Sequence, residues 1–189
     1  MKKFAMAVAV MVMLAAVCGA SAAQAAEGKV LVAYFSWGGN TASVAKAIAG
    51  ALGAELFEIK TAKPYPKDYN ATLDVAKAEQ ARNDRPELST HVGDMGQYDT
   101  VFLGYPNWWG TLPMPIFTFL EEYDFAGKRV IPFVTHGGSS FGRSLSDIRK
   151  LAPKAELEEK GLSLSGSRAA GAGNQIVSWL EGLGFAVKK

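Results

Sequence analysis

The chain has 189 residues, of which 20 are lysine or arginine and 18 are aspartate or glutamate, with a single cysteine, Cys18. This near-neutral balance gives no single-sign field that would favour nucleic acid or an anionic membrane surface as a partner. One cysteine excludes a disulfide within the chain, and the length suffices for one domain with a full core.

The N-terminal residues have the pattern of a secretory signal peptide. Lys2 and Lys3 precede an apolar run over residues 4–17, and Ala23-Gln24-Ala25 fits a small-x-small cleavage site. The apolar run is shorter than the roughly 20 residues that span a bilayer, which argues against a retained membrane anchor. We therefore expect residues 1–25 to be removed on export.

Cleavage there would leave residues 26–189 as one mature domain without a membrane span. That domain would carry 18 basic and 18 acidic residues, and hence no formal net charge. It would also lose Cys18, so that no thiolate metal ligand or cysteine nucleophile would remain. A lipoprotein acylated on Cys18 is the minor alternative to an exported, periplasmic protein.

Hydrophobic periodicity predicts strands and helices that alternate along the chain. Strands are predicted at residues 30–35, 55–60, 98–105 and 129–134 and within 155–164. Helices are predicted at residues 41–52, 70–82, 113–123, 144–151 and 174–183, with loops at 61–69 and 83–97. The second helix is expected to turn Leu73, Val75 and Ala76 inward. Such alternation predicts a parallel sheet with helices on both faces.

Three loops of unusual composition each follow a buried strand. They span residues 36–41, 106–111 and 135–143, and they are rich in glycine, small polar residues or tryptophan. Ligands of parallel sheets bind beyond the carboxyl ends of the strands. The three loops are therefore expected to form one site.

The first loop, SWGGNT, has the character of a phosphate site. Ser36 and Thr41 offer hydroxyls, Asn40 an amide, and Gly38 and Gly39 backbone N–H groups at the start of a helix. The loop has no lysine or arginine and matches neither GxxxxGK[ST] nor GxGxxG, so neither a nucleoside triphosphate nor a dinucleotide is indicated. A single terminal phosphate fits, although a plain strand–helix turn would also use the glycines.

The second loop adds a flat ring to this hypothesis. Trp108 and Trp109 directly follow a buried strand, where indole rings favour stacking on a heteroaromatic ligand. The alternative is a tryptophan pair in the core or at a dimer interface. A phosphate at one strand end and a flat ring at a neighbouring one describe a mononucleotide such as FMN.

The motifs resemble those of flavodoxins, in particular flavodoxin-like proteins with an N-terminal YFS-x-x-GNT motif. The chain has YFS at residues 34–36 with GNT at 39–41, then GYPNWWG at 104–110 and FVTHGG at 133–138, in the family's order. The resemblance covers nearly all of residues 26–189. It implies an α/β fold, the flavodoxin-like three-layer αβα sandwich with a five-stranded parallel sheet, and FMN as the cofactor.

The resemblance also implies a role for each loop. The residues expected to bind the FMN phosphate are Ser36, Gly38, Gly39, Asn40 and Thr41. Those expected to line the isoalloxazine ring are Pro106, Asn107, Trp108, Trp109 and Gly110, with one of the two tryptophans stacked on it. Those expected to border the ring from the other side are Thr135, His136, Gly137, Gly138 and Ser139. Gly110 is the candidate for a peptide that reorients when the flavin is reduced.

The family implies electron transfer with a redox partner protein, but two features leave alternatives open. Electron-shuttling flavodoxins are usually strongly acidic, whereas residues 26–189 are neutral. The PNWWGTLP run at 106–113 is also similar to a stretch of flavodoxin-like quinone reductases, which pass hydride from a nicotinamide to a quinone. An NAD(P)H-dependent quinone or FMN reductase is one alternative, and a non-catalytic flavin-binding module is another.

His136 is a weak candidate for a catalytic group, because it could donate a proton to reduced flavin; the favoured role is to order its own loop. Residues 138–142 match GxSxG, but both histidines precede Ser140, against the triad order of α/β-hydrolases. Two isolated histidines predict no metal site. Tyr65 and Tyr69 are expected to pack the proline-containing loop rather than to cover the site.

Overall fold

The computed structural model describes residues 28–188. The predicted signal peptide, residues 1–25, and the alternative acylation site at Cys18 lie outside these residues.

The strands form one parallel sheet in the order β2-β1-β3-β4-β5. They are β1 (Lys29–Tyr34), β2 (Glu55–Glu58), β3 (Tyr98–Pro106), β4 (Arg129–His136), β5 (Glu156–Leu157) and β6 (Leu162–Ser165). The chain leaves β1 toward one edge of the sheet and returns to the other side of β1 as β3. The strand order therefore switches between β1 and β3, the place where open α/β sheets bind their ligands.

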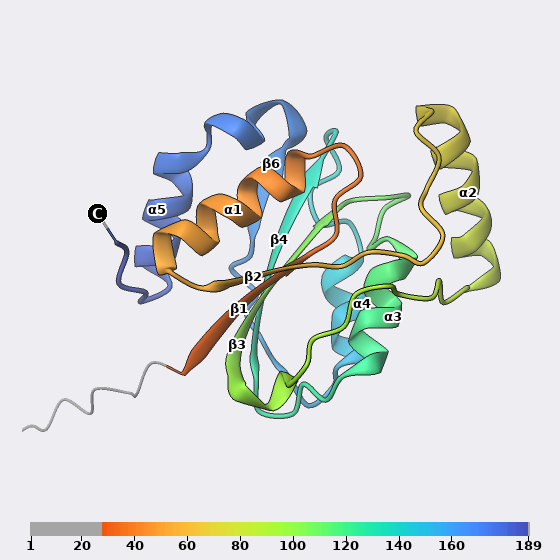
Figure 1. Ribbon diagram of the computed structural model, residues 1–189. Helices are drawn as coiled ribbons and strands as arrows, with labels where there is room; N and C mark the ends of the chain where they lie inside the picture. The colour runs from red at the N-terminus through yellow and green to blue at the C-terminus, as the bar shows by residue number, and fades with distance from the viewer. Residues whose placement is uncertain (1–27, 189) are drawn as a thin grey trace, which may run out of the picture.

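The helices make two outer layers (Figure 1). α1 (Asn40–Leu52) and α5 (Gly173–Gly182) cover one face of the sheet, whereas α3 (Met114–Glu122) and α4 (Ser144–Leu151) cover the other. Two short 3₁₀ helices, η1 (Met95–Gln97) and η2 (Gly166–Gly171), precede β3 and α5. The predicted three-layer sandwich is confirmed.

Alternate residues of the central strands supply two separate cores. In β1, Leu31 and Ala33 pack on the α3–α4 side, and Val32 and Tyr34 pack on the α1–α5 side. All four are almost fully buried. Because both faces are covered, a central strand needs apolar side chains on both, which explains its continuous apolar run in the sequence.

The fifth strand position is divided between β5 and β6, where the sequence predicts one strand within residues 155–164. β5 pairs with Arg129 and Val130 of β4, and β6 pairs with β4 from Phe133 onward. Pro132 lies at the break, and a proline has no N–H to donate to a ladder. The sheet keeps five strand positions, with the last one interrupted.

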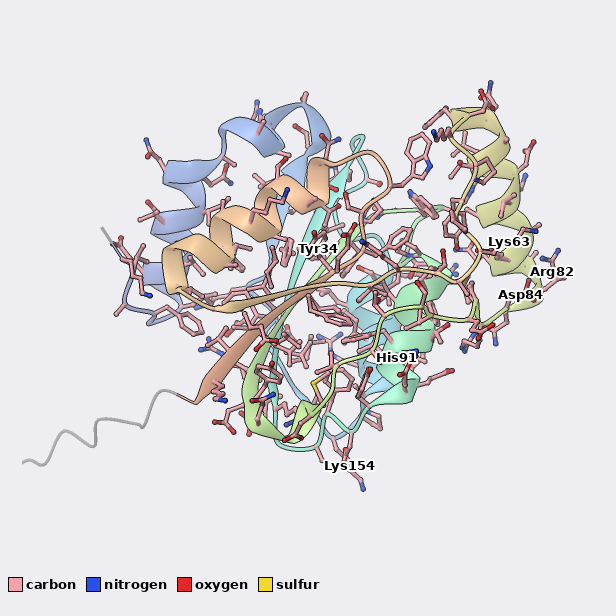
Figure 2. All side chains as sticks on the ribbon, in the orientation of Figure 1. Tyr34, Lys63, Arg82, Asp84, His91 and Lys154 are labelled. Carbon is pink, nitrogen blue, oxygen red and sulfur yellow. The ribbon has the colours of Figure 1, made fainter. Side chains whose placement is uncertain are left out.

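α2 (Tyr69–Arg82) stands apart from the sheet (Figure 1). Its buried residues are Thr72 and Ala76, whereas Val75 is 37% exposed, so the predicted inward position of Val75 is wrong. The helix borders α3 without lying flat on a sheet face, and its short contact surface needs few apolar side chains. Arg82, the last residue of the helix, pairs with Asp84 at the outside of the molecule (Figure 2).

The close packing of β3 on β4 makes Gly104 sensitive to substitution. A Cβ at this position would lie 2.1 Å from Cζ of the buried Phe133 ring. We expect Gly104→Ala to lower the free energy of unfolding by about 1–3 kcal/mol, as overpacked cores do. Gly50→Ala is the control, because its Cβ would meet nothing within 4 Å on the exposed side of α1. Alanine favours a helix over glycine, so the free energy of unfolding of this variant should rise by up to about 1 kcal/mol. Urea denaturation measures both, and equal stabilities of the two variants would contradict this account.

Candidate functional site

A cleft of about 690 Å³ opens at the carboxyl ends of β1, β3, β4 and β6. The predicted site residues that line it are Ser36, Gly38, Asn40, Thr41, Pro106, Asn107, Trp108, Trp109, Thr135, His136 and Gly137. Gly39, Gly110, Gly138 and Ser139 belong to the same loops but are not part of its lining. The structure thus brings the three predicted loops together at the switch point.

One end of the cleft is formed by the first turn of α1. Gly39 precedes this helix with φ +85°, a left-handed conformation that suits glycine. The Ser36 hydroxyl accepts hydrogen bonds from the N–H groups of Gly39 and Ala42, each at 3.2 Å, and thus keeps its own proton for another acceptor. The N–H groups of Asn40 and Thr41 have no acceptor among residues 28–188. Free amides at a helix N-terminus favour an anion.

Two buried threonines join this helix to β4. The hydroxyls of Thr41 and Thr135 are 2.8 Å apart, and both side chains are buried. Only one of their two protons lies between them, so the other can be donated elsewhere. Within the described part of the chain, the lining contains no lysine or arginine. This end of the cleft is therefore rich in neutral donors, which suits one phosphate group.

Trp109 stands at the tip of a tight turn at the other end. Trp108 and Thr111 exchange backbone hydrogen bonds of 3.0 and 3.1 Å, and the two residues between them, Trp109 and Gly110, have φ +51° and +82°. Positive φ at both central positions defines a type I′ turn. For a bulky residue such as Trp109 this conformation is strained, and backbone strain of this kind clusters at ligand sites.

The Trp109 ring is held from outside and remains accessible. Its Nε1–H donates to the carbonyl of Leu73 in α2 at 3.0 Å, and the Lys77 ammonium lies 5.1 Å from the ring centroid. The side chain is still 44% exposed. A rigidly held indole with free surface is suited to stack on a flat ligand.

Trp108 has a different environment from its neighbour. Its ring meets Phe35 and Tyr65 edge to face, with centroid distances of 5.4 and 5.0 Å. The Tyr65 hydroxyl donates to the Glu79 carboxylate at 2.5 Å, and burial raises the pKa of both groups. Trp108 is thus part of the wall behind the cleft, and Trp109 presents the more accessible ring.

Trp37 and Tyr69 add an aromatic pair that the sequence analysis did not assign to the site. The Trp37 Nε1–H donates to the carbonyl of Pro66 at 2.7 Å, and its ring centroid is 6.1 Å from that of Tyr69. Both rings are exposed and line the cleft. Tyr65 packs on Phe35 and Trp108 and is not part of the cleft lining, in line with the expectation that it does not cover the site. The expectation for Tyr69 is wrong, because Tyr69 borders the cleft as the first residue of α2.

Asn107 links the tryptophan turn to the loop after β4. Its Oδ1 accepts from the Gly110 N–H at 3.0 Å, and its Nδ2 donates to the Ser140 carbonyl at 2.7 Å. The Gly110 carbonyl in turn accepts from the Arg143 N–H at 2.9 Å. Both polar groups of Gly110 are therefore engaged, and reorientation of its peptide would break the bonds to Asn107 or Arg143.

His136 uses both ring nitrogens within the protein. The Gly138 N–H donates to Nδ1 at 2.9 Å, so Nδ1 carries no proton and the proton is on Nε2, 3.0 Å from the Ser163 hydroxyl. Ser163 also lies 2.8 Å from the Ser140 hydroxyl. In this arrangement His136 orders its loop, and it has no carboxylate partner of the kind that a hydrolase triad requires.

Six lining residues were not predicted as site residues: Trp37, Tyr69, Leu73, Ser165, Gly166 and Ser167. Trp37 sits inside the SWGGNT motif, and its position between two site residues is the signal that could have identified it. The others come from α2, from the end of β6 and from the start of η2, and no local pattern places those segments at the cleft.

Two further properties concern residues 28–188 only. No helix in this range is long and apolar enough to cross a bilayer. Nor does the range contain a group of three or more histidine, cysteine, aspartate or glutamate side chains that could hold a metal ion.

A parallel sheet of order 2-1-3-4-5, with a phosphate-type loop after β1 and aromatic side chains after β3, defines the flavodoxin-like class of α/β proteins. The family model described as flavodoxin matches residues 29–183, and the chain belongs to this family. A search of curated proteins found no match.

Several solved structures are similar to this chain. A candidate flavoprotein from Bacteroides eggerthii is 34% identical, with a TM-score of 0.70, over 83% of this chain and 98% of its own. A candidate flavoprotein from Bacteroides uniformis is also 34% identical, with a TM-score of 0.72, over 82% of this chain and 98% of its own. A flavoprotein from Lactobacillus acidophilus, solved in complex with FMN, is 26% identical, with a TM-score of 0.63, over 80% and 98%.

Proposed function

We propose that this protein binds FMN in the cleft and acts in electron transfer. The observation that carries the proposal is the division of one cleft into a neutral, donor-rich end at α1 and an aromatic end at Trp109 and Trp37. A phosphate monoester suits the first end and a flat heteroaromatic ring suits the second. The similarity to the FMN complex from Lactobacillus acidophilus supports the same ligand.

FMN would supply the redox chemistry, since its isoalloxazine ring accepts and returns electrons. The protein's own residues would bind and orient it. The amides of Asn40 and Thr41 and the hydroxyl of Ser36 would bind the phosphate, and Trp109 would cover the ring. Asn107 would hold the tryptophan turn at a constant distance from the loop after β4. His136, with both nitrogens engaged, would position that loop rather than transfer a proton.

An NAD(P)H-dependent quinone or FMN reductase is the second candidate. It is favoured by the Trp37–Tyr69 pair, which lines the cleft in addition to Trp109 and offers exposed aromatic surface for a second flat ring. A nicotinamide or a quinone would be such a ring. In the shuttle alternative, a redox partner protein would take the electrons at the open mouth of the cleft.

A redox titration separates these functions. The purified protein should bind added FMN, with a shifted visible spectrum, and anaerobic reduction should accumulate one-electron-reduced flavin if the protein is a shuttle. Rapid bleaching by NADH or NADPH, with turnover on a quinone, would instead establish the reductase. Bound FMN with neither property would indicate a non-catalytic flavin-binding module, and absence of FMN binding would refute all three.

Single tryptophan variants test the ring end of the cleft. We expect Trp109→Ala to weaken FMN binding by roughly tenfold, because stacking on an aromatic ring contributes about 0.5–1.5 kcal/mol beyond the area that it buries. Trp179→Ala is the matched control, since this half-buried indole belongs to α5, is not part of the cleft lining, and donates its Nε1–H to the Lys160 carbonyl. Flavin fluorescence gives both dissociation constants, and an unchanged affinity of Trp109→Ala would reject the stacking role.

We also propose that the protein is exported and works in the periplasm. The support is the pattern of residues 1–25, with Lys2 and Lys3 before an apolar run and a small-x-small site at residues 23–25. The mature protein should begin at Ala26 and be recovered from the periplasmic fraction. N-terminal sequencing that finds Met1 would refute the cleavage. A lipid-modified Cys18 would show that the protein is a lipoprotein instead.

A further inference from the structure

We propose that Ser165, Gly166 and Ser167 form the second half of the phosphate site and thereby select a cofactor that ends in a single phosphate monoester. This inference rests on the proposed binding of FMN. It assigns a ligand-binding role to a segment that lies more than 120 residues after the SWGGNT loop in the sequence.

The tertiary structure places this segment at the N-terminus of α1. β6 ends at Ser165, which pairs with His136 at the end of β4. η2 begins at the next residue, and its Ala169 is buried in the same apolar cluster as Ile48 of α1. The segment is therefore held on both sides, by the sheet through β6 and by the α1 core through η2.

Gly166 lies so close to α1 that an added methyl group would meet the Asn40 side chain. A Cβ at this position would be 2.7 Å from Nδ2 of Asn40, the first residue of the helix, and 4.0 Å from the His136 carbonyl oxygen. The φ of Gly166 is not in the left-handed region, so close approach, rather than backbone conformation, explains the glycine. The backbone at Gly166 consequently forms part of the cleft wall, beside the side chain of the first residue of α1.

The two serines supply donors on this wall. Their hydroxyl oxygens are 3.2 Å apart, and both residues line the cleft. Only one hydroxyl proton can lie between the two oxygens, which leaves the other for an acceptor in the cleft. These neutral donors face the same space as the amides of Asn40 and Thr41, in a lining without lysine or arginine among the described residues. A phosphate there would gain charge-assisted hydrogen bonds from both sides.

The role predicts a specific loss of phosphate recognition. FMN and riboflavin share the ring and the ribityl chain and differ only in the terminal phosphate. Ser165→Ala and Ser167→Ala should each weaken FMN binding several-fold, and the double variant by roughly tenfold or more. Riboflavin binding should stay within about twofold of the original protein. Titration of flavin fluorescence measures all the dissociation constants.

A pair of glycine variants tests the wall by a different route. Gly166→Ala should displace the Asn40 side chain and weaken FMN binding by roughly tenfold, with riboflavin nearly unaffected. Gly171→Ala is the matched control, because this residue of the same 3₁₀ helix also lacks a left-handed φ and a Cβ there would meet nothing within 4 Å. It should leave both affinities within about twofold.

The outcomes separate this inference from the proposed function. If the original protein binds no FMN, the proposed function fails and this inference fails with it. If it binds FMN but the double serine variant keeps its full preference for FMN over riboflavin, only the role of the segment is refuted. An equal loss of FMN and riboflavin affinity would also refute it, because the segment would then support the fold or the ring rather than the phosphate.

Discussion

Burial of the sheet on both faces is the constraint on which the rest of the molecule depends. The central strands have apolar side chains above and below, covered by α1 and α5 on one side and by α3 and α4 on the other. Polar chemistry can therefore reach the centre of the protein only at the ends of the strands. At the carboxyl ends, the switch between β1 and β3 separates the loops enough to leave a cleft, and the lining of that cleft decides which ligand the protein can bind.

The two ends of the cleft are held by different means. The phosphate-type end is continuous with the core, because the first turn of α1 is tied to β4 through Thr41 and Thr135. The aromatic end depends on α2, which buries little and stands away from the sheet. There the indole N–H groups of Trp37 and Trp109 donate to carbonyls at Pro66 and Leu73. Hydrogen bonds thus tie Trp109 to α2 and Trp37 to the loop that precedes this helix.

Local sequence patterns predicted much of the fold and of the site. Apolar runs indicated the buried strands, helical spacing indicated the covering helices, and the composition of three loops indicated where they would converge. The prediction was less accurate where a distant contact overrides local pattern. Val75 has the character of a core residue but is exposed, because α2 has no sheet face to cover. The last strand is broken opposite Pro132, whose missing N–H lies in a neighbouring strand and not in the broken one.

The sequence by itself determined the α/β fold, the family, and the two loops that suggest a phosphate and a flat ring, because strand burial and turn composition are local properties. Only the tertiary structure decided that Trp109 is the accessible ring of its pair, that Trp37 and Tyr69 join it, and that His136 is fully engaged. It also decided that Ser165 to Ser167 lie beside Asn40. Those facts depend on which strand ends become neighbours, and strand order arises from packing across the whole sheet rather than from any single segment.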